Sequence, residues 1–430
     1  MFSDRTNWRL APNRFTQAVE ETRARGAHLL DLTASNPTRV GLEFDSEAII
    51  GALRSPRALD YDPQAKGLQA AREAVANYYE FEPGVRAVDP ERIVLTASTS
   101  EGYSYVFRLL CNAGDELLVP KPSYPLFEFL ADLQDVKLVP YPLIYDHGWQ
   151  MDFHSLQRAV TPRTRGVVAV HPNNPTGSYV KAAEVELLNK FCRERSLALI
   201  VDEVFLDYDL GTSGAKAGTG KDDPDRSAES ASPANGKAGV TLDTGSLHAP
   251  GRDDRDRSFA GNKQVLTFTL SGLSKISALP QMKVAWIVTS GPEEQVAGAM
   301  ARLEVIADTY LSMNAPVQWA VPVLLEQRES IQRQLVARVK RNLEELDRQL
   351  AAQRACQRLY LEGGWYAVLR VPVTRSDEEL AIALVIEQSV IVHPGHFYDF
   401  ESDGYLVLSL IAPFGEFEEG ARRIMNLLSC

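Results

Sequence analysis

Apolar residues along the chain fall into two patterns, short unbroken runs and longer stretches with helical spacing. The run at 166–170 is apolar without alternation, which is typical of a strand buried on both faces in a parallel sheet. Stretches in which apolar side chains recur on one face predict helices. The expected strands lie at 29–33, 92–96, 115–120, 166–170, 196–201 and 264–270. The expected helices lie at 13–25, 69–80, 103–112 and 184–195.

The C-terminal part of the chain is dominated by a long stretch with helical spacing, from 292 to about 354. Its apolar positions recur at near-helical intervals, at Ile331, Leu335, Val339, Leu343 and Leu346. Two strands are expected after it, at 363–370 and 406–410, and a closing helix at 417–428. The long stretch therefore suits a connector helix that leads into a smaller C-terminal domain.

The segment 211–262 interrupts both patterns. It is rich in Gly, Ser, Ala, Asp, Lys and Arg, and its only large apolar side chains are Val240, Leu242, Leu247 and Phe259. Such a segment buries too little apolar surface to offset the entropy of ordering it. We therefore expect a flexible insertion, and nothing in its residues supports a regulatory role.

Length and composition bound the class of protein. A chain of 430 residues exceeds the usual size of a single core, so two domains are expected. The net charge of −12 disfavours a general nucleic-acid or anionic-membrane binder. No apolar run of about 18 residues predicts a membrane helix, and the charged N-terminus does not resemble a signal peptide. The four cysteines lack ligand-like spacing, so we expect structural thiols, no metal site and a cytoplasmic protein.

Three motifs place reactive side chains after expected strands. Lys275 follows the strand at 264–270, Asp202 ends the strand at 196–201, and Asn174 lies in the Asn-Asn-Pro-Thr-Gly string after the strand at 166–170. Each residue alone has an ordinary explanation, a surface lysine or a capping carboxylate for example. Together they supply an amine, an acid and an amide, the groups needed to hold a carbonyl cofactor with an acidic phosphate.

Small hydroxyl residues mark a fourth position, between the strand at 92–96 and the helix that follows. Ser98, Thr99 and Ser100 offer backbone N–H groups and hydroxyls at the positive end of a helix, which suits a phosphate. A simple N-cap explains the same residues, because Ser and Thr cap helices routinely. The sequence leaves both interpretations open.

These motifs, in this order, resemble the class I/II (fold type I) pyridoxal-phosphate aminotransferases of the aspartate aminotransferase-like superfamily. The resemblance runs from about Asp31 to the C-terminus, apart from the insertion. It implies an α/β fold, with a mostly parallel central sheet flanked by helices in a large domain and a smaller α/β domain. The implied division is an N-terminal arm and part of the small domain at 1–40, a large cofactor-binding domain at 41–300, and a connector helix with the small domain at 301–430.

The resemblance also assigns roles to particular residues. Lys275 is implied as the Schiff-base lysine of pyridoxal 5′-phosphate, and Asp202 as the carboxylate against the pyridine nitrogen. Asn174 is implied to donate to the ring oxygen. The remaining implied cofactor contacts are ring stacking by Tyr124, phosphate contacts by Ser98, Thr99, Ser100, Ser271 and Lys283, and a phosphate contact by Tyr61 from the neighbouring subunit of a homodimer. By spacing alone, an ordinary packed or surface side chain is the favoured interpretation of both Tyr124 and Tyr61.

Several positions depart from the family pattern. Phe205 stands where many relatives have tyrosine, Gly272 where serine is common, and Lys283 where arginine usually holds the phosphate. Val407 stands where an arginine usually binds the substrate carboxylate, and valine cannot make that contact. Asn36 and Arg39, in the segment that lines the mouth of the site in the family, are the candidate substrate contacts, with Arg39 the candidate replacement cation. The loop at 392–398, with two histidines, is a second candidate region.

The leading hypothesis is a homodimeric pyridoxal-phosphate aminotransferase that acts on an amino acid and a 2-oxo acid. Because of Val407, a lyase or cyclase that uses the same cofactor is the alternative. A non-catalytic ligand sensor fused to a DNA-binding domain is disfavoured, because the residues before Asp31 offer no helix-turn-helix. The donor and acceptor do not follow from the sequence.

Overall fold

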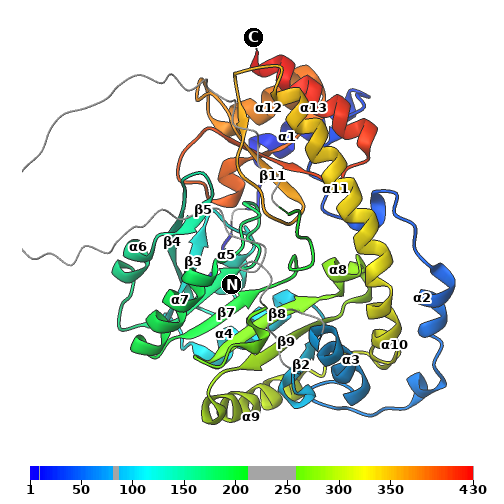
Figure 1. Cartoon of the computed structure of the whole chain (residues 1–430), viewed down its shortest axis with the longest axis vertical. Coiled ribbons are helices and arrows are strands. Elements are labelled where there is room, and N and C mark those ends of the chain that lie inside the picture. Colours follow the sequence, from blue (N-terminus) through cyan, green and yellow to red (C-terminus); the bar gives the residue numbers. More distant parts are fainter. Residues whose placement is uncertain (9, 81–86, 212–257, 430) are drawn as a thin grey trace, which may run out of the picture.

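The computed structural model describes residues 1–8, 10–80, 87–211 and 258–429. It contains an eight-stranded sheet with helices around it, and a second region in which a four-stranded sheet and a two-stranded pair are covered by helices (Figure 1). The helix α11 (Arg328–Leu350) runs along one side from the first region to the second (Figure 1). No helix within the described ranges is long and apolar enough to span a bilayer.

The large sheet has the strand order β2-β9-β8-β7-β6-β3-β4-β5. Strands β8, β7, β6, β3 and β4 run parallel to one another. Strand β9 is antiparallel to β8 and to β2, and β5 is antiparallel to β4. Strands β7, β8 and β9 are buried along their whole length, and 166–170 of β6 is buried as its unbroken apolar run predicts. The bounds are β2 (Ile93–Thr96), β3 (Glu116–Lys121), β4 (Lys137–Tyr145), β5 (Trp149–Met151), β6 (Thr164–Val170), β7 (Ala198–Asp202), β8 (Thr267–Gly272) and β9 (Ala285–Ser290).

Helices pack on this sheet through apolar faces. One core joins α4 and α9 to β3, β7 and β8, and another joins α3 and α10 to β2 and β9. The bounds of the helices in this region are α2 (Ser46–Ala52), α3 (Gln69–Glu80), α4 (Thr99–Leu110), α5 (Phe127–Asp132), α6 (Phe153–Arg158), α7 (Ala182–Arg195), α8 (Leu273–Ile276), α9 (Glu293–Tyr310) and α10 (Ala315–Glu326).

The second region joins the two ends of the chain. Strand β1 (Leu30–Asp31) pairs in parallel with β12 (Val390–Ile391). The four-stranded antiparallel sheet has the order β10-β11-β14-β13. Its remaining elements are α1 (Arg14–Ala24), β10 (Gln357–Arg358), β11 (Tyr366–Arg370), α12 (Asp377–Gln388), β13 (His393–Pro394), β14 (Tyr405–Ser409) and α13 (Phe414–Leu428).

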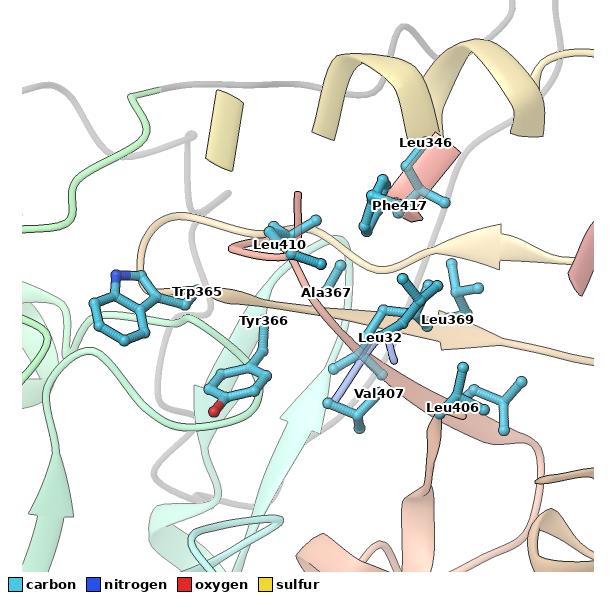
Figure 2. Packing of buried hydrophobic residues seen from close by; sticks show 14 of the residues in the cluster. Leu32, Leu346, Trp365, Tyr366, Ala367, Leu369, Leu406, Val407, Leu410 and Phe417 are labelled. Atoms are coloured by element: carbon cyan, nitrogen blue, oxygen red, sulfur yellow. The ribbon is translucent and has the colours of Figure 1, made fainter. Parts of the chain in front are cut away.

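The core of this second region lies between its sheet and the helices α11 and α13. Figure 2 shows Leu346 and Phe417 meeting Leu410 and Ala367 above the sheet, with Tyr366 and Val407 on the opposite side. The register explains the sides: Val407 is opposite Val368 on β11, and Tyr366 is two residues from Val368. Tyr366, Val368 and Val407 therefore lie on the face of the small sheet opposite to the one that α11 and α13 cover (Figure 2).

The long helical stretch expected at 292–354 is wrong as one element. The structure has three helices there, α9, α10 and α11. Leu311 adopts a left-handed conformation with φ of 44°, which ends α9, and Asn314 caps the start of α10 with its side chain. Because α9 and α10 pack on α4 and α3, residues 301–326 belong structurally with the large sheet rather than with the C-terminal unit.

Most of the expected insertion at 211–262 lies outside the described residues. Its last part, 258–262, is ordered and includes the short helical turn Phe259–Gly261. Phe259 is buried, and Glu203 accepts hydrogen bonds from the Ser258 hydroxyl (2.6 Å) and the Phe259 N–H (2.6 Å). The expected flexibility is therefore wrong for 258–262, while 212–257 lies outside the described residues.

Candidate active site

The reactive motifs meet at one edge of the large sheet. Strands β3, β6, β7 and β8 are parallel, so their carboxyl ends lie on the same side. Strand β2 points the same way, because it is antiparallel to β9 and β9 is antiparallel to β8. The turns after these five strands carry the predicted Ser98–Ser100, Tyr124, Asn174, Asp202 and Lys275.

Lys275 lies in the single helical turn α8, directly after β8, with a partly exposed side chain. Its Nζ donates a hydrogen bond to the main-chain oxygen of Ser35 at 3.3 Å. The same atom lies 4.7 Å from the ring centroid of Trp365 and 5.5 Å from that of Phe205. Burial lowers the pKa of the Lys275 ammonium to about 8, and the negative charge of Asp202 opposes this shift. The amine is therefore closer to its neutral, nucleophilic form than a solvated lysine is.

Asp202 ends β7 and is buried. Its Oδ2 accepts a hydrogen bond from the Tyr103 hydroxyl at 3.0 Å, and its Oδ1 accepts one from the Val204 N–H at 3.0 Å. Burial raises the pKa of the carboxyl to about 6, while these two hydrogen bonds and the charge of Lys275 lower it. Asp202 is opposite Leu270 at the ends of the neighbouring strands β7 and β8, and Lys275 follows β8 within one helical turn, so the two charges lie near enough to act on each other.

Asn174 and Tyr124 offer polar atoms that the described chain does not use. The Oδ1 atom of Asn174 is buried and has no hydrogen-bond partner within the described ranges. Leaving such an atom unpaired costs about 1–3 kcal/mol, so its position favours a ligand. Tyr124 follows β3 with its ring partly exposed, and burial together with the charge of Asp202 raises the pKa of its hydroxyl to about 12. Both residues remain candidates for contact with a bound molecule.

The hydroxyl residues predicted to hold a phosphate are only partly free. Ser98 is the N-cap of α4, and its Oγ accepts the Glu101 N–H at 3.1 Å, as the capping interpretation requires. Thr99 and Ser100 open the helix, where the first N–H groups have no partner within the helix. Ser271 is buried, and its hydroxyl donates to the main-chain oxygen of Glu203 at 3.3 Å. The N–H groups of Thr99 and Ser100 are thus the better phosphate donors of this set.

Two predicted cofactor contacts point outward from this chain. Lys283 is exposed, in a left-handed conformation with φ of 54°. Tyr61 is 85% exposed. It lines a cavity of about 400 Å³, together with Arg57 and Trp319, to which neither Lys275 nor Asp202 contributes. A single chain therefore does not bring Tyr61 to the lysine.

The predicted mouth segment does reach the site, through its main chain. Ser35 accepts the Lys275 hydrogen bond, and the carbonyl oxygen of Ala34 accepts one from the Ser409 hydroxyl at 2.5 Å. The side chain of Asn36 caps the following turn by accepting from the N–H (3.0 Å) and hydroxyl (2.7 Å) of Thr38. Arg39 is exposed. The substrate roles of Asn36 and Arg39 remain predictions.

The face of the small sheet toward this edge is mostly uncharged. Val407 is fully buried in β14, opposite Val368 and His393. His393 is hydrogen bonded through Nδ1 to the Tyr398 hydroxyl at 3.0 Å, and burial lowers the pKa of its ring to about 4. The cation on this face is Arg370, whose guanidinium stacks over the rings of Tyr145 and Tyr405 at 5.5 and 5.9 Å.

Sequence patterns did not identify four side chains around Lys275 and Asp202. Tyr103 is distant in sequence from Asp202, and Trp365 is distant from Lys275, so no local motif links either pair. Phe205 was noted only for the hydroxyl it lacks, and no role was predicted for Tyr208. The signal that could have found them is aromatic enrichment beside the strand ends.

Comparisons with known proteins agree on one family. The family model of aminotransferase class I and II matches residues 28–410. The chain is 30% identical over 310 residues to the glutamate-pyruvate aminotransferase AlaA of Escherichia coli (strain K12), a match that spans 71% of this chain and 65% of the relative's length. It is 26% identical to the alanine aminotransferase of Mycobacterium bovis, over 96% of this chain and 88% of the relative. The structure of alanine aminotransferase from Pyrococcus furiosus has a similar fold, with a TM-score of 0.81, 20% identity and full coverage of both chains.

Proposed function

The chain belongs to the class I and II aminotransferase family, and from this premise we propose that it moves an amino group from an amino acid to a 2-oxo acid with pyridoxal 5′-phosphate as cofactor. The observation that carries the proposal is the pairing of Lys275 with Asp202 in one site, each charge acting on the other. An amine with a lowered pKa beside a buried acid is the pair that this chemistry requires.

The residues present fit the cofactor. Its aldehyde needs an amine, which Lys275 supplies, and its ring nitrogen needs a buried acid, which Asp202 supplies. The unpaired Oδ1 of Asn174 marks a side-chain amide with unused hydrogen-bonding capacity, suited to the polar edge of a ring. The N-terminus of α4 offers N–H groups to a phosphate.

The task of each site residue would follow from its surroundings. The cofactor, when bound, supplies an electron-withdrawing ring that acidifies the Cα–H bond of the amino substrate. Asp202 would hold a proton on the ring nitrogen, because Tyr103 and Val204 keep its oxygens in place. Lys275, with a pKa of about 8, would take the proton from the substrate Cα and return it to the carbon that carried the cofactor's aldehyde.

The substrates follow from the names of the relatives. Glutamate and pyruvate, with alanine and 2-oxoglutarate as the reverse pair, are the first combination we propose. Val407 is the observation that favours the alternative, a lyase or cyclase with the same cofactor. Because the relatives are named aminotransferases, amino transfer is the function that we propose.

We further propose a homodimer in which Tyr61 of each subunit reaches the cofactor phosphate of the other. Leu59 and Tyr61 are 91% and 85% exposed on one short segment, which is unusual for side chains of this size in a monomer. The cavity beside them includes Trp319 and Met313, so a partner surface would bury apolar area there. Size measurement of the purified chain, and of Tyr61→Ala, tests this part.

The experiment that tests the function follows both products of a two-substrate reaction. The purified protein with cofactor is incubated with glutamate and pyruvate, and 2-oxoglutarate and alanine are measured in parallel. Transfer predicts equal amounts of both products and no free ammonia. Ammonia and an oxo acid formed from the amino acid alone, without the second product, would instead support the lyase alternative.

A further inference from the structure

The lysine-bearing turn is held by side chains that come from outside it. Helix α8 is only one turn long, Leu273–Ile276, so its carbonyls have few partners within the helix. The Tyr208 hydroxyl donates to the main-chain oxygen of Lys275 itself, at 2.6 Å. Gln332 donates through Nε2 to the main-chain oxygen of Ile276, at 2.9 Å. Two consecutive carbonyls at the end of the turn are thus fixed from two different elements.

Tyr208 is itself fixed by packing. Its side chain is fully buried, and its ring meets that of Trp365 edge-on, with centroids 5.0 Å apart. Trp365 is also the ring over which the Lys275 Nζ lies, at 4.7 Å. One aromatic pair therefore contacts both ends of the lysine, its main-chain oxygen through Tyr208 and its ammonium through Trp365.

Gln332 is fixed by a partly buried carboxylate, that of Asp207. Its Nε2 donates a second hydrogen bond, to Oδ2 of Asp207 at 2.6 Å, which uses both hydrogens of the amide. Oδ1 of Asp207 accepts the Tyr78 hydroxyl at 3.0 Å. Tyr78 lies on α3 and Gln332 on α11, so the carboxylate joins two helices to the turn that carries Lys275. A network with all its partners satisfied holds a geometry more rigidly than a single contact does.

The strand end before the turn leaves little room for a shift. A Cβ at Gly272 would lie 2.8 Å from the main-chain oxygen of Val284 and 2.8 Å from Cβ of Ala285. The N–H of Leu273 donates to the same Val284 oxygen at 3.0 Å. Because the start of the turn is in close contact with β9, the direction of the lysine side chain depends on the contacts at the end of the turn.

We infer that Tyr208 and Gln332 are positioning residues for Lys275, which aim its amine by fixing the carbonyls of Lys275 and Ile276. This inference rests on the proposed function for the role of the amine, but not for the position of the turn. Displacing a reacting group by about 1 Å costs on the order of 100-fold in rate, so even a small relaxation of the turn is measurable.

The test compares two buried hydroxyls that make the same kind of bond. Tyr208→Phe removes the bond to Lys275, and Tyr179→Phe removes a bond from a buried tyrosine to the main-chain oxygen of Leu206, at 3.0 Å. Gln332→Met repeats the test from α11, at a partly exposed position that tolerates a side chain of similar size. Amide hydrogen exchange is followed across 273–279 in the full chain, with and without pyridoxal 5′-phosphate, and kcat and KM are measured with the same preparations.

We expect faster exchange at 273–279 and a fall in kcat of about 10- to 100-fold in Tyr208→Phe and Gln332→Met, with KM within about threefold of the parent. Tyr179→Phe should leave exchange at 273–279 unchanged. The inference would be overturned if Tyr208→Phe and Gln332→Met both kept the kcat of the parent. It would also be overturned if exchange at 273–279 were as fast in Tyr179→Phe as in these two variants. If the parent chain shows no transfer, the exchange comparison still decides the position of the turn, while the proposed function falls by itself.

Discussion

The two sheets contribute to the site in different ways. At the carboxyl edge of the large sheet, a partly exposed amine lies near a buried carboxylate, and both pKa values are displaced toward neutrality. Across from it, the small sheet presents Val407, fully buried, where the resembled family carries an arginine, and its nearby cation Arg370 is stacked on two tyrosines. The comparison indicates that the proposed reactive groups follow the family pattern, whereas the position where the family binds the substrate carboxylate departs from it.

Removing the amine of Lys275 should have the largest effect on activity. We expect Lys275→Ala to lower kcat by about 1,000-fold or more, because both the proton transfer and the covalent attachment depend on this atom. Single-turnover assays of alanine formation measure the loss. Lys263→Ala is the control, since this lysine is exposed and has no role in the proposed site, and a similar loss in both variants would contradict the assignment.

Replacing the acid should lower activity less and raise stability. The folded-state pKa of Asp202, about 6, lies above the ordinary 3.8, so its stabilising contribution is present below pH 4 and is lost as pH rises through 6. The free energy of unfolding of Asp202→Asn should therefore exceed that of the parent by roughly 1–3 kcal/mol at pH 7.5 and equal it at pH 4. We expect the kcat of this variant to be about 100-fold lower.

Denaturant titrations of the cofactor-free protein at the two pH values check the stability part of this prediction. Equal stability of Asp202→Asn and the parent at pH 7.5 would mean that burial does not raise the pKa of this carboxyl. Glu203→Gln is a poor control because Glu203 has its own buried partners, so the exposed Asp308→Asn serves instead.

Tyr103→Phe should produce a smaller effect on the same carboxylate. The Tyr103 hydrogen bond lowers the pKa of Asp202, so without it the carboxyl should titrate at a higher pH than in the parent. We expect the acidic limb of the pH–rate profile to move up by about half to one unit, with a three- to tenfold loss in kcat at pH 7. An unmoved limb with reduced activity would indicate a role in packing alone.

Val407→Ala should have the smallest effect on kcat and still destabilise the fold. The side chain is fully buried among apolar neighbours, so its truncation should cost roughly 1–3 kcal/mol of unfolding free energy. We expect kcat to change by less than about threefold, since valine offers no group to the reaction. A large loss of kcat without loss of stability would show that this position contacts the substrate closely.

The sequence predicted the strand ends well, because these signals are local, and the predicted reactive residues lie in the turns after them. The helix Gln69–Glu80 has the bounds expected from its apolar spacing. The turn motifs reach one edge because the parallel order of the strands brings them there. The break of the 292–354 stretch was missed because apolar spacing continues through it, whereas the left-handed residue Leu311 that ends α9 is not typical of a helix end.

Contacts between distant segments were beyond local patterns. Tyr103 reaches Asp202 from another element, and Tyr208 reaches the Lys275 carbonyl only once α8 is in place. The capping role of the Ser98 side chain was one of two interpretations that the sequence left open, and only the hydrogen bond to Glu101 decides it. What selects the substrate depends on the packing of the small sheet, which no single motif encodes.

The central claim is that the cofactor is bound covalently to Lys275, and chemical trapping tests it directly. The full chain, saturated with pyridoxal 5′-phosphate, is reduced with borohydride, digested and mapped by mass spectrometry. The account predicts a reduced cofactor adduct on the peptide that contains Lys275, and none on that peptide when an amino substrate is added before the reduction. An adduct only on another lysine, such as Lys283, or no adduct at all, would contradict it.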